Sequence, residues 1–234
     1  MIKHKITGDH GYLRISNYRE YFHPLVSAEE GDWVIDGGAS NGKTSFRFSS
    51  RVGSKGKVFA FEPDPTNAQK IEAGIQLQPE RSNVVLMQSA LSDRSGTLNF
   101  TATADGSSRL EDGGGVSVSA KRIDDLDLPK CDLISLDIEG AEASALNGAA
   151  ATIRKLRPKL QISIYHRRED LFSLPLLVRT LTENYAFFIG HHDAYHSETD
   201  LYAIPRERLT PNNRHQTYGS IVGRIFKIRS GMNR

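Results

Sequence analysis

The chain has 234 residues, of which 38% are hydrophobic and 25% charged, with a net charge of +2. Such values are typical of one globular α/β domain. No stretch approaches the ~18 consecutive apolar residues of a membrane-spanning helix, and the N-terminal residues lack the apolar run of a secretory signal. Cys131 is the only cysteine. An internal disulfide is therefore excluded, and we expect a cytoplasmic protein.

Short apolar runs bounded by turn residues predict seven core strands, and apolar residues at helical spacing predict helices between several of them. The runs are near-continuous, as in strands buried on both faces of a parallel sheet. Their alternation with helices predicts βαβ units with right-handed crossovers, that is, a Rossmann-like α/β fold. In chain order we expect strands at 33–36, 58–61, 84–87, 133–136, 160–164, 186–189 and 201–204, and helices at 42–52, 65–77, 142–156 and 171–183.

Residues 88–130 break this alternation. The segments 97–101 and 116–120 alternate like strands, and a glycine-containing loop over 102–115 separates them. We therefore expect a β-excursion between the third and fourth core strands.

The charged residues suggest a division of the chain into three parts. Residues 206–234 hold seven Lys and Arg against one Glu, so we expect a basic tail there, after a domain over 31–205 and an N-terminal extension over 1–30. The tail fits either a solvated end or a contact with an anionic surface such as lipid headgroups. No basic stripe interleaved with aromatic residues is present in the body, so we expect no nucleic-acid partner.

A glycine-rich turn, VIDGGASNGKTS over 34–45, follows the first strand and opens the first helix. Glycines allow a ligand to approach the backbone, and a helix N-terminus offers free N–H groups, so this layout indicates a cofactor site. A nicotinamide site would need G-x-G-x-x-G, which residues 36–44 lack. A P-loop is an open alternative, because the segment also matches its pattern in full. That match is Gly37-x-x-x-x-Gly42-Lys43-Thr44.

The P-loop interpretation leaves two acidic residues without a role, and S-adenosylmethionine gives both of them one. Asp36 begins the spacing Asp36-x-Gly38-x-x-x-Gly42, and Glu62 closes the second strand. An acid at the carboxyl edge of that strand can accept hydrogen bonds from both ribose hydroxyls.

Five segments together resemble the FkbM-type methyltransferases, a branch of the class I S-adenosylmethionine enzymes. The most specific is the run Asp137-Ile138-Glu139-Gly140-Ala141-Glu142 after the fourth strand. The chain departs from the family at Gly37 and Ser40, where members often have a larger apolar residue and an asparagine. The matching segments are VIDGGASNG (34–42), FAFEPDPTNAQKI (59–71), SALSDRSGTLNF (89–100), KRIDDL (121–126) and LISLDIEGAEASALNGA (133–149).

The resemblance implies a class I fold whose last strand is antiparallel, and it implies S-adenosylmethionine as the cofactor. The loop over 36–42 would hold the methionine moiety, Glu62 the ribose and the segment 89–91 the adenine. Asp137 is a further candidate, for the methionine amino group. The full expected set is Asp36, Gly37, Gly38, Ala39, Ser40, Asn41, Gly42, Glu62, Pro63, Ser89, Ala90 and Asp137.

Acidic and imidazole groups follow the fourth, fifth and sixth strands, and the carboxyl ends of parallel strands share one edge. We therefore expect Asp137, Glu139, His166 and His192 to converge beside the cofactor. A hydroxyl acceptor needs a base, and a neutral histidine suits that role, with His166 the first candidate, His192 the second and Asp137 nearby. These same four residues are also ligand types for a divalent metal, a rival use that we favour less.

The predicted function is methyl transfer from S-adenosylmethionine to a hydroxyl of a saccharide or secondary metabolite. The acceptor class comes from the family resemblance. The alternatives are a P-loop NTPase and a non-catalytic cofactor-binding module of the same fold.

Overall fold

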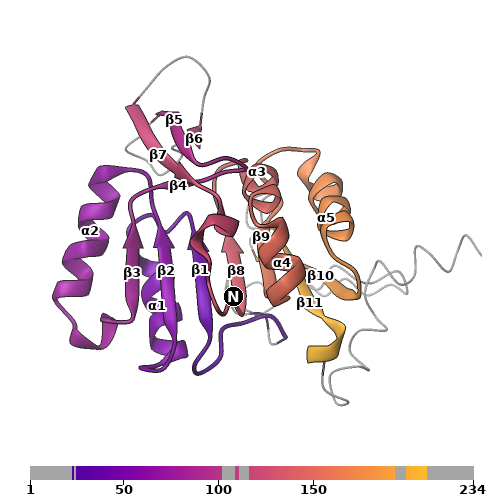
Figure 1. The fold of residues 1–234 in the computed structure, drawn as a ribbon, viewed down its shortest axis with the longest axis horizontal. Helices are drawn as coiled ribbons and strands as arrows, with labels where there is room; N and C mark the ends of the chain where they lie inside the picture. Colours follow the sequence, from indigo (N-terminus) through magenta and orange to yellow (C-terminus); the bar gives the residue numbers. More distant parts are fainter. Residues whose placement is uncertain (1–22, 24, 102–108, 111–115, 193–198, 210–234) are drawn as a thin grey trace, which may run out of the picture.

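The computed structural model describes residues 23, 25–101, 109–110, 116–192 and 199–209. Seven strands form one sheet in the order β10-β11-β9-β8-β1-β2-β3 (Figure 1). Strand β11 is antiparallel to both of its neighbours, and the other pairs are parallel. The predicted class I α/β fold is thereby confirmed. The strands are β1 Trp33–Gly37, β2 Lys57–Phe61, β3 Val84–Met87, β8 Leu133–Leu136, β9 Lys159–Ser163, β10 Tyr185–His191 and β11 Thr199–Pro205.

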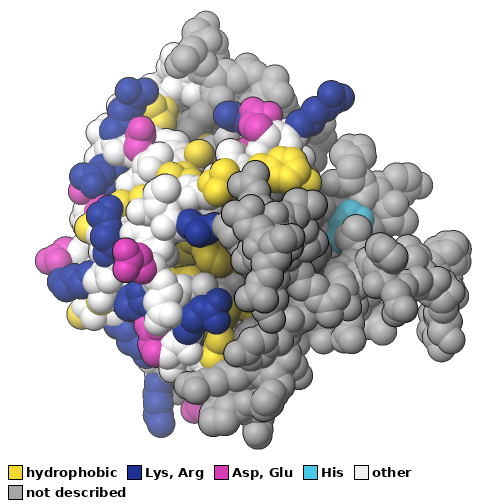
Figure 2. Space-filling view, turned by 90° about the vertical axis from the view of Figure 1, so that its right-hand side faces the viewer, with side chains coloured by type: hydrophobic (Ala, Val, Ile, Leu, Met, Phe, Trp, Pro, Cys, Tyr) yellow, Lys and Arg dark blue, Asp and Glu magenta, His cyan; other side chains and the backbone are white. Residues whose placement is uncertain are grey.

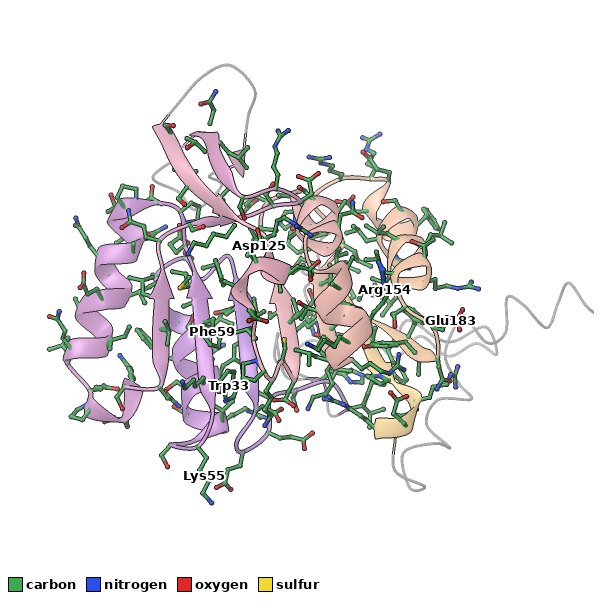
Figure 3. The ribbon with its side chains drawn as sticks, in the orientation of Figure 1. Trp33, Lys55, Phe59, Asp125, Arg154 and Glu183 are labelled. Carbon is green, nitrogen blue, oxygen red and sulfur yellow. The ribbon has the colours of Figure 1, made fainter. Side chains whose placement is uncertain are left out.

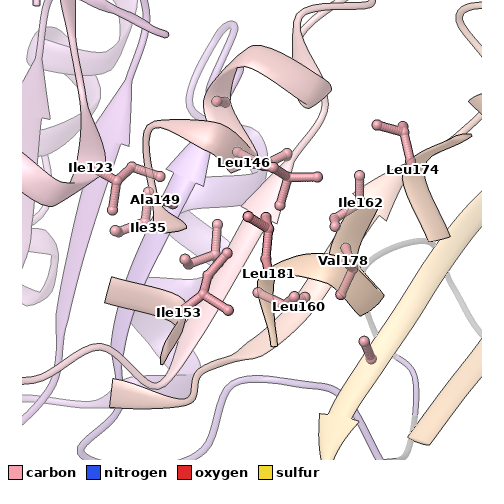
Figure 4. Close-up of a cluster of buried hydrophobic side chains, with 14 of the residues drawn as sticks. Ile35, Ile123, Leu146, Ala149, Ile153, Leu160, Ile162, Leu174, Val178 and Leu181 are labelled. Atoms are coloured by element: carbon pink, nitrogen blue, oxygen red, sulfur yellow. The ribbon is translucent and has the colours of Figure 1, made fainter. Parts of the chain in front are cut away.

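Helices cover both faces of this sheet. Consecutive residues of β1 pack into two separate hydrophobic cores. Ile35 packs with helices α3, α4 and α5, whereas Val34 packs with α1 and α2. Figure 4 shows part of the first core, where Leu146, Ile153 and Val178 meet over the sheet. The helices are α1 Lys43–Val52, α2 Pro65–Gln76, α3 Glu142–Asn147, α4 Ala150–Leu156 and α5 Asp170–Leu181.

The helix expected over 142–156 is in fact two helices. A Cβ on Gly148 would lie 2.0 Å from the carbonyl oxygen of Ser92, so the chain passes directly against another segment there. The carboxylate of Asp124 then accepts the backbone N–H groups of Ala151 and Thr152 and caps the start of α4. Contacts distant in sequence thus end one helix and begin the next.

The predicted β-excursion forms a small second sheet in the order β4-β7-β5-β6, which rises from the carboxyl edge of the main sheet (Figure 1). The residues 102–108 and 111–115 of its expected loop lie outside the described residues. The strands are β4 Ala90–Leu91, β5 Gly96–Thr101, β6 Arg109–Leu110 and β7 Val116–Lys121, and the short 3-10 turns elsewhere are η1 Pro79–Arg81, η2 Ile123–Leu126 and η3 Arg206–Arg208.

Both ends of the described chain pack on the domain. Val26 is fully buried, and Lys159 Nζ donates to the Ser27 carbonyl at 2.6 Å. At the other end Leu209 is buried and Glu207 forms an ion pair with Arg157. Most of the expected N-terminal extension, residues 1–22 and 24, and most of the expected basic tail, residues 210–234, lie outside the described residues. No helix in the described part has the length and hydropathy to cross a membrane.

Two groups of aromatic and apolar side chains are partly or fully exposed. Trp33 and Phe59 lie together on neighbouring strands (Figure 3), with ring centroids 5.8 Å apart. On the face shown in Figure 2, apolar side chains lie among lysines and arginines. Helix α5 contributes exposed apolar residues to the surface: Leu171, Phe172 and Leu176.

Candidate active site

The glycine turn after β1 is pressed against the end of β8. Gly38 has φ +83°, and a Cβ there would lie 1.8 Å from the carbonyl oxygen of Asp137. Gly42, with φ +84°, immediately precedes α1, and a Cβ on it would meet the ring of Phe46 at 2.8 Å. Only glycine fits at these two positions, because each combines a left-handed backbone with a close neighbour. The turn therefore packs its backbone tightly between the end of β8 and the first turn of α1.

Glu62 ties this turn to the end of β2. Its Oε2 accepts the Ser40 backbone N–H at 2.7 Å, and its Oε1 accepts the Asp64 N–H at 2.8 Å. Burial raises the pKa of Glu62 to about 7, although both backbone N–H donors favour the charged form. Ser40 itself has φ 50°, a left-handed conformation that asparagine tolerates better than most residues.

Asp36 lies beneath the turn and is almost fully buried. Its Oδ2 accepts the Ser45 hydroxyl of α1 at 2.5 Å. Burial raises the pKa of Asp36 to about 7; the Ser45 hydrogen bond lowers it, while the charges of Asp137 and Glu62 raise it further. The carboxylate therefore links strand β1 to helix α1 from inside.

The other expected cofactor residues lie around this junction. The N–H groups of Gly38 and Ala39 both donate to the Phe61 carbonyl, at 3.1 and 3.0 Å. Asn41 is exposed, and its Oδ1 accepts the Lys43 N–H at 3.2 Å. Pro63 follows Glu62 and is half-buried.

The segment after β3 joins the same edge of the sheet. Ser89 is buried and its N–H donates to the Met87 carbonyl at 2.7 Å, and Ala90 begins the small strand β4. A Cβ on Gly37 would lie 2.8 Å from Leu91 Cδ1, so the residues after β3 lie against the glycine turn after β1. The expected methionine, ribose and adenine residues thus adjoin one another in space.

Four side chains form a second group, which we call the His166 cluster: Asp137, Glu139, Glu142 and His166. His166 Nε2 lies 3.2 Å from Asp137 Oδ1 and 3.5 Å from Glu139 Oε2, and Nδ1 lies 3.0 Å from Glu142 Oε1. The hydroxyl of Tyr165 also donates to Asp137 Oδ1, at 3.3 Å. The structure therefore brings together three of the four expected residues and adds Glu142.

Glu142 was not among the residues expected to converge at this edge. In the structure the loop turns back through Glu139 at φ 55° and Gly140 at φ 91°. The buried Oε1 of Glu142 then accepts the N–H of Ile138 at 2.9 Å and of Gly140 at 3.4 Å. Glu142 is the third acid of the D-x-E-G-x-E run, and this run was the sequence signal that could have identified it. Its return toward His166, however, depends on the left-handed backbone of Glu139 and Gly140.

The cluster controls the charge of His166. Burial alone would lower the pKa of His166, but the carboxylates of Asp137 and Glu142 outweigh burial and raise it to about 10. These carboxylates therefore favour the protonated form of the imidazole.

His192 belongs to a different, buried network. Its Nε2 lies 2.7 Å from the Tyr202 hydroxyl, which donates to Asp200 Oδ2 at 2.9 Å. The strand order explains the separation: β11 lies between β10, which precedes His192, and β9, which precedes His166. The expected convergence of His192 with the other three residues is therefore not observed.

The sheet order, the carboxylate closing β2 and the glycine turn place the chain in the class I S-adenosylmethionine methyltransferase fold. The Methyltransferase FkbM domain family matches residues 36–195, and the chain belongs to this family. A solved structure of Methyltransferase FkbM from Methylobacillus flagellatus KT has a TM-score of 0.61 and 26% identity, covering 75% of this chain and 43% of that one.

Two curated relatives are also similar. The 2-O-methyltransferase NoeI of Sinorhizobium fredii is 28% identical in a match of 149 residues that covers 53% of this chain and 60% of the relative. The hexuronic acid methyltransferase AglP of Haloferax volcanii is 27% identical over 139 residues, 56% of each chain. This chain thus matches little more than half the length of these relatives. The family membership favours a methyltransferase over the P-loop alternative, in which Lys43 would be essential.

Proposed function

We propose that this protein transfers a methyl group from S-adenosylmethionine to a hydroxyl oxygen of a saccharide. The observation that carries the proposal is the hydrogen bond from the Ser40 N–H to Glu62. It holds a carboxylate beside the glycine-rich turn at the carboxyl edge of the sheet. Family membership and the named activities of NoeI and AglP support the choice of donor and acceptor class. A secondary-metabolite hydroxyl is the alternative acceptor.

The cofactor would lie along the edge formed by β1, β2 and β3. The turn over 36–42 would hold the methionine moiety, with Asp137 near its amino group. Glu62 keeps a lone pair on each carboxylate oxygen for the two ribose hydroxyls beyond its backbone partners, and Pro63 follows it. Ser89 and Ala90 would border the adenine, because they lie next to the same edge.

Asp137 links the His166 cluster to the proposed cofactor edge, because its backbone carbonyl packs against Gly38 of the glycine turn. Its side chain is 23% exposed, whereas that of His166 is 8% exposed and lies behind it. In the proposed reaction the acceptor oxygen attacks the methyl carbon, the carbon–sulfur bond breaks and S-adenosylhomocysteine leaves. The hydroxyl proton passes to Asp137, which His166 and Tyr165 orient. The buried contacts of His192 give it no part in this step.

The proposal is tested by calorimetric titration of S-adenosylmethionine, S-adenosylhomocysteine and ATP into one preparation. Binding of the first two without ATP supports the donor site; ATP binding that requires Lys43 would support a P-loop instead. Bacterial glycan extracts are then incubated with the radiolabelled methyl donor. Transfer that Asp137→Asn reduces supports the enzyme, whereas cofactor binding without transfer to any acceptor supports a non-catalytic module. A cytoplasmic location stays a prediction from the lone cysteine.

A further inference from the structure

The buried side of the His166 cluster contains ligand-type atoms that its hydrogen bonds do not satisfy. Glu142 is fully buried, and its Oε2 has no hydrogen-bond partner in the described part of the chain. The ring nitrogens of His166 approach carboxylates at 3.0 and 3.2 Å, yet neither makes a hydrogen bond of good geometry. Buried polar atoms normally find partners because leaving them unpaired is costly. These atoms therefore indicate a further ligand.

We propose that Asp137, Glu142 and His166 form a binding site for a divalent cation. Each of the three can offer one ligand atom, and these atoms all lie within 4.8 Å of one another. Three carboxylates gathered around one imidazole, counting Glu139 at 3.5 Å, favour a cation as the missing ligand. Carboxylate ligands suit Mn²⁺ and Mg²⁺, and imidazole suits several first-row transition metals, so Mn²⁺ fits the mixed set best.

The cluster becomes more exposed from one end to the other, as a catalytic cation site requires. The side chains of Glu142 and His166 are 1% and 8% exposed, whereas those of Asp137 and Glu139 are 23% and 35% exposed. The buried end is fixed by backbone donors to Glu142, and the exposed end leaves room for solvent or acceptor oxygens. Catalytic metal sites keep such open positions. A bound cation would supply Lewis acidity to the acceptor hydroxyl; this use, though not the binding, rests on the proposed function.

Isothermal titration of MnCl₂ into the chelator-treated full chain tests the proposal, with electron paramagnetic resonance to separate free from bound Mn²⁺. We expect one site whose affinity falls at least about tenfold in Glu142→Gln and in Asp137→Asn, because each variant removes a charged ligand. The matched control is Glu72→Gln, which neutralises an exposed glutamate of α2 and should bind Mn²⁺ like the unmodified chain.

Equal Mn²⁺ affinity in the unmodified chain, Glu142→Gln and Asp137→Asn would overturn the proposal, as would the absence of any bound Mn²⁺. Asp137→Asn covers the case in which Glu142→Gln fails to fold, because Asp137 is partly exposed. Titration of S-adenosylmethionine into the same metal-free samples separates the two proposals. If S-adenosylmethionine binds but Mn²⁺ does not, only the proposed cation site is contradicted. If Mn²⁺ binds but S-adenosylmethionine does not, only the proposed methyl donor is contradicted.

Discussion

The backbone N–H of Ser40 donates to Glu62 Oε2 at 2.7 Å, and this one hydrogen bond joins the turns that follow β1 and β2. The two residues are 22 positions apart in the chain, and parallel pairing brings them together, with Gly37 opposite Phe61. The carboxylate is thereby fixed before any ligand arrives. A site arranged in advance loses less entropy when the ligand binds.

Replacing Glu62 should weaken cofactor binding. Glu62→Gln puts an amide where two backbone N–H donors and two ribose hydroxyls need acceptors, so we expect at least about a tenfold loss of S-adenosylmethionine affinity. Calorimetry measures the loss, and Lys43→Ala, an exposed neighbour in α1, is the control that should leave affinity within about twofold. Because burial raises the pKa of Glu62 to about 7, affinity should also rise from pH 6 to 8 in the unmodified chain and stay flatter in Glu62→Gln. The reverse ranking of the two variants would contradict the ribose assignment.

The close approach at Gly38 can be separated from backbone strain by comparing two alanine variants. Gly31 and Gly38 both have φ +83°, but a Cβ on Gly31 meets nothing within 4 Å, whereas one on Gly38 would lie 1.8 Å from the Asp137 carbonyl. Gly31→Ala should cost about 1–2 kcal/mol in the free energy of unfolding. Gly38→Ala should cost clearly more, because β8 must shift as well. Urea unfolding measures both, and equal losses would show that the contact at Gly38 is unimportant.

Removing the hydroxyl that supports Asp36 should destabilise the fold. Ser45→Ala leaves a buried carboxylate without its 2.5 Å donor and should cost about 1–3 kcal/mol in the free energy of unfolding. Ser50→Ala changes the same residue type in the same helix at an exposed position and should stay within about 0.5 kcal/mol. Chemical denaturation compares the two variants; indistinguishable stabilities would contradict a stabilising role for the Ser45–Asp36 hydrogen bond.

His23 should make the fold sensitive to acid. Its ring stacks on Tyr202 at 4.7 Å, and its Nδ1 accepts the Leu25 N–H at 3.1 Å. Burial, together with the charge of His192, lowers the pKa of His23 to about 4. The unfolded chain, whose histidine pKa is near ~6.5, then binds the proton more tightly than the folded chain. The stabilising contribution is complete above about pH 6.5 and is lost as the pH falls toward 4.

The variant His23→Phe keeps the ring and cannot be protonated, so it serves as the reference for this effect. It should be about 1 kcal/mol less stable than the unmodified chain at pH 7.5, because the Leu25 N–H loses its acceptor. This difference should shrink or reverse by pH 4.5, since only the unmodified chain must expel a proton there to stay folded. Thermal unfolding across this pH range tests the prediction, and parallel curves for the two proteins would refute it.

Local sequence patterns predicted the strands of the main sheet and part of the candidate site. Near-continuous apolar runs predicted the seven core strands, because strands buried on both faces are rich in apolar residues. The glycine spacing from Gly38 to Gly42 and the acid closing β2 predicted the edge at which we propose that the cofactor binds, because both lie next to a strand end. The carboxyl-edge rule likewise grouped Asp137, Glu139 and His166, whose strands β8 and β9 are direct neighbours.

Only the tertiary structure decided three other features. The helix break at Gly148 depends on Ser92, and the fold-back of Glu142 depends on left-handed backbone at Glu139 and Gly140. The place of His192 depends on β11 entering the sheet between β9 and β10. The first and third features depend on segments far apart in the chain, and the second depends on backbone dihedral angles that the residue types leave open. Hydrophobic periodicity records which residues are buried, but it does not record which partner they are buried against.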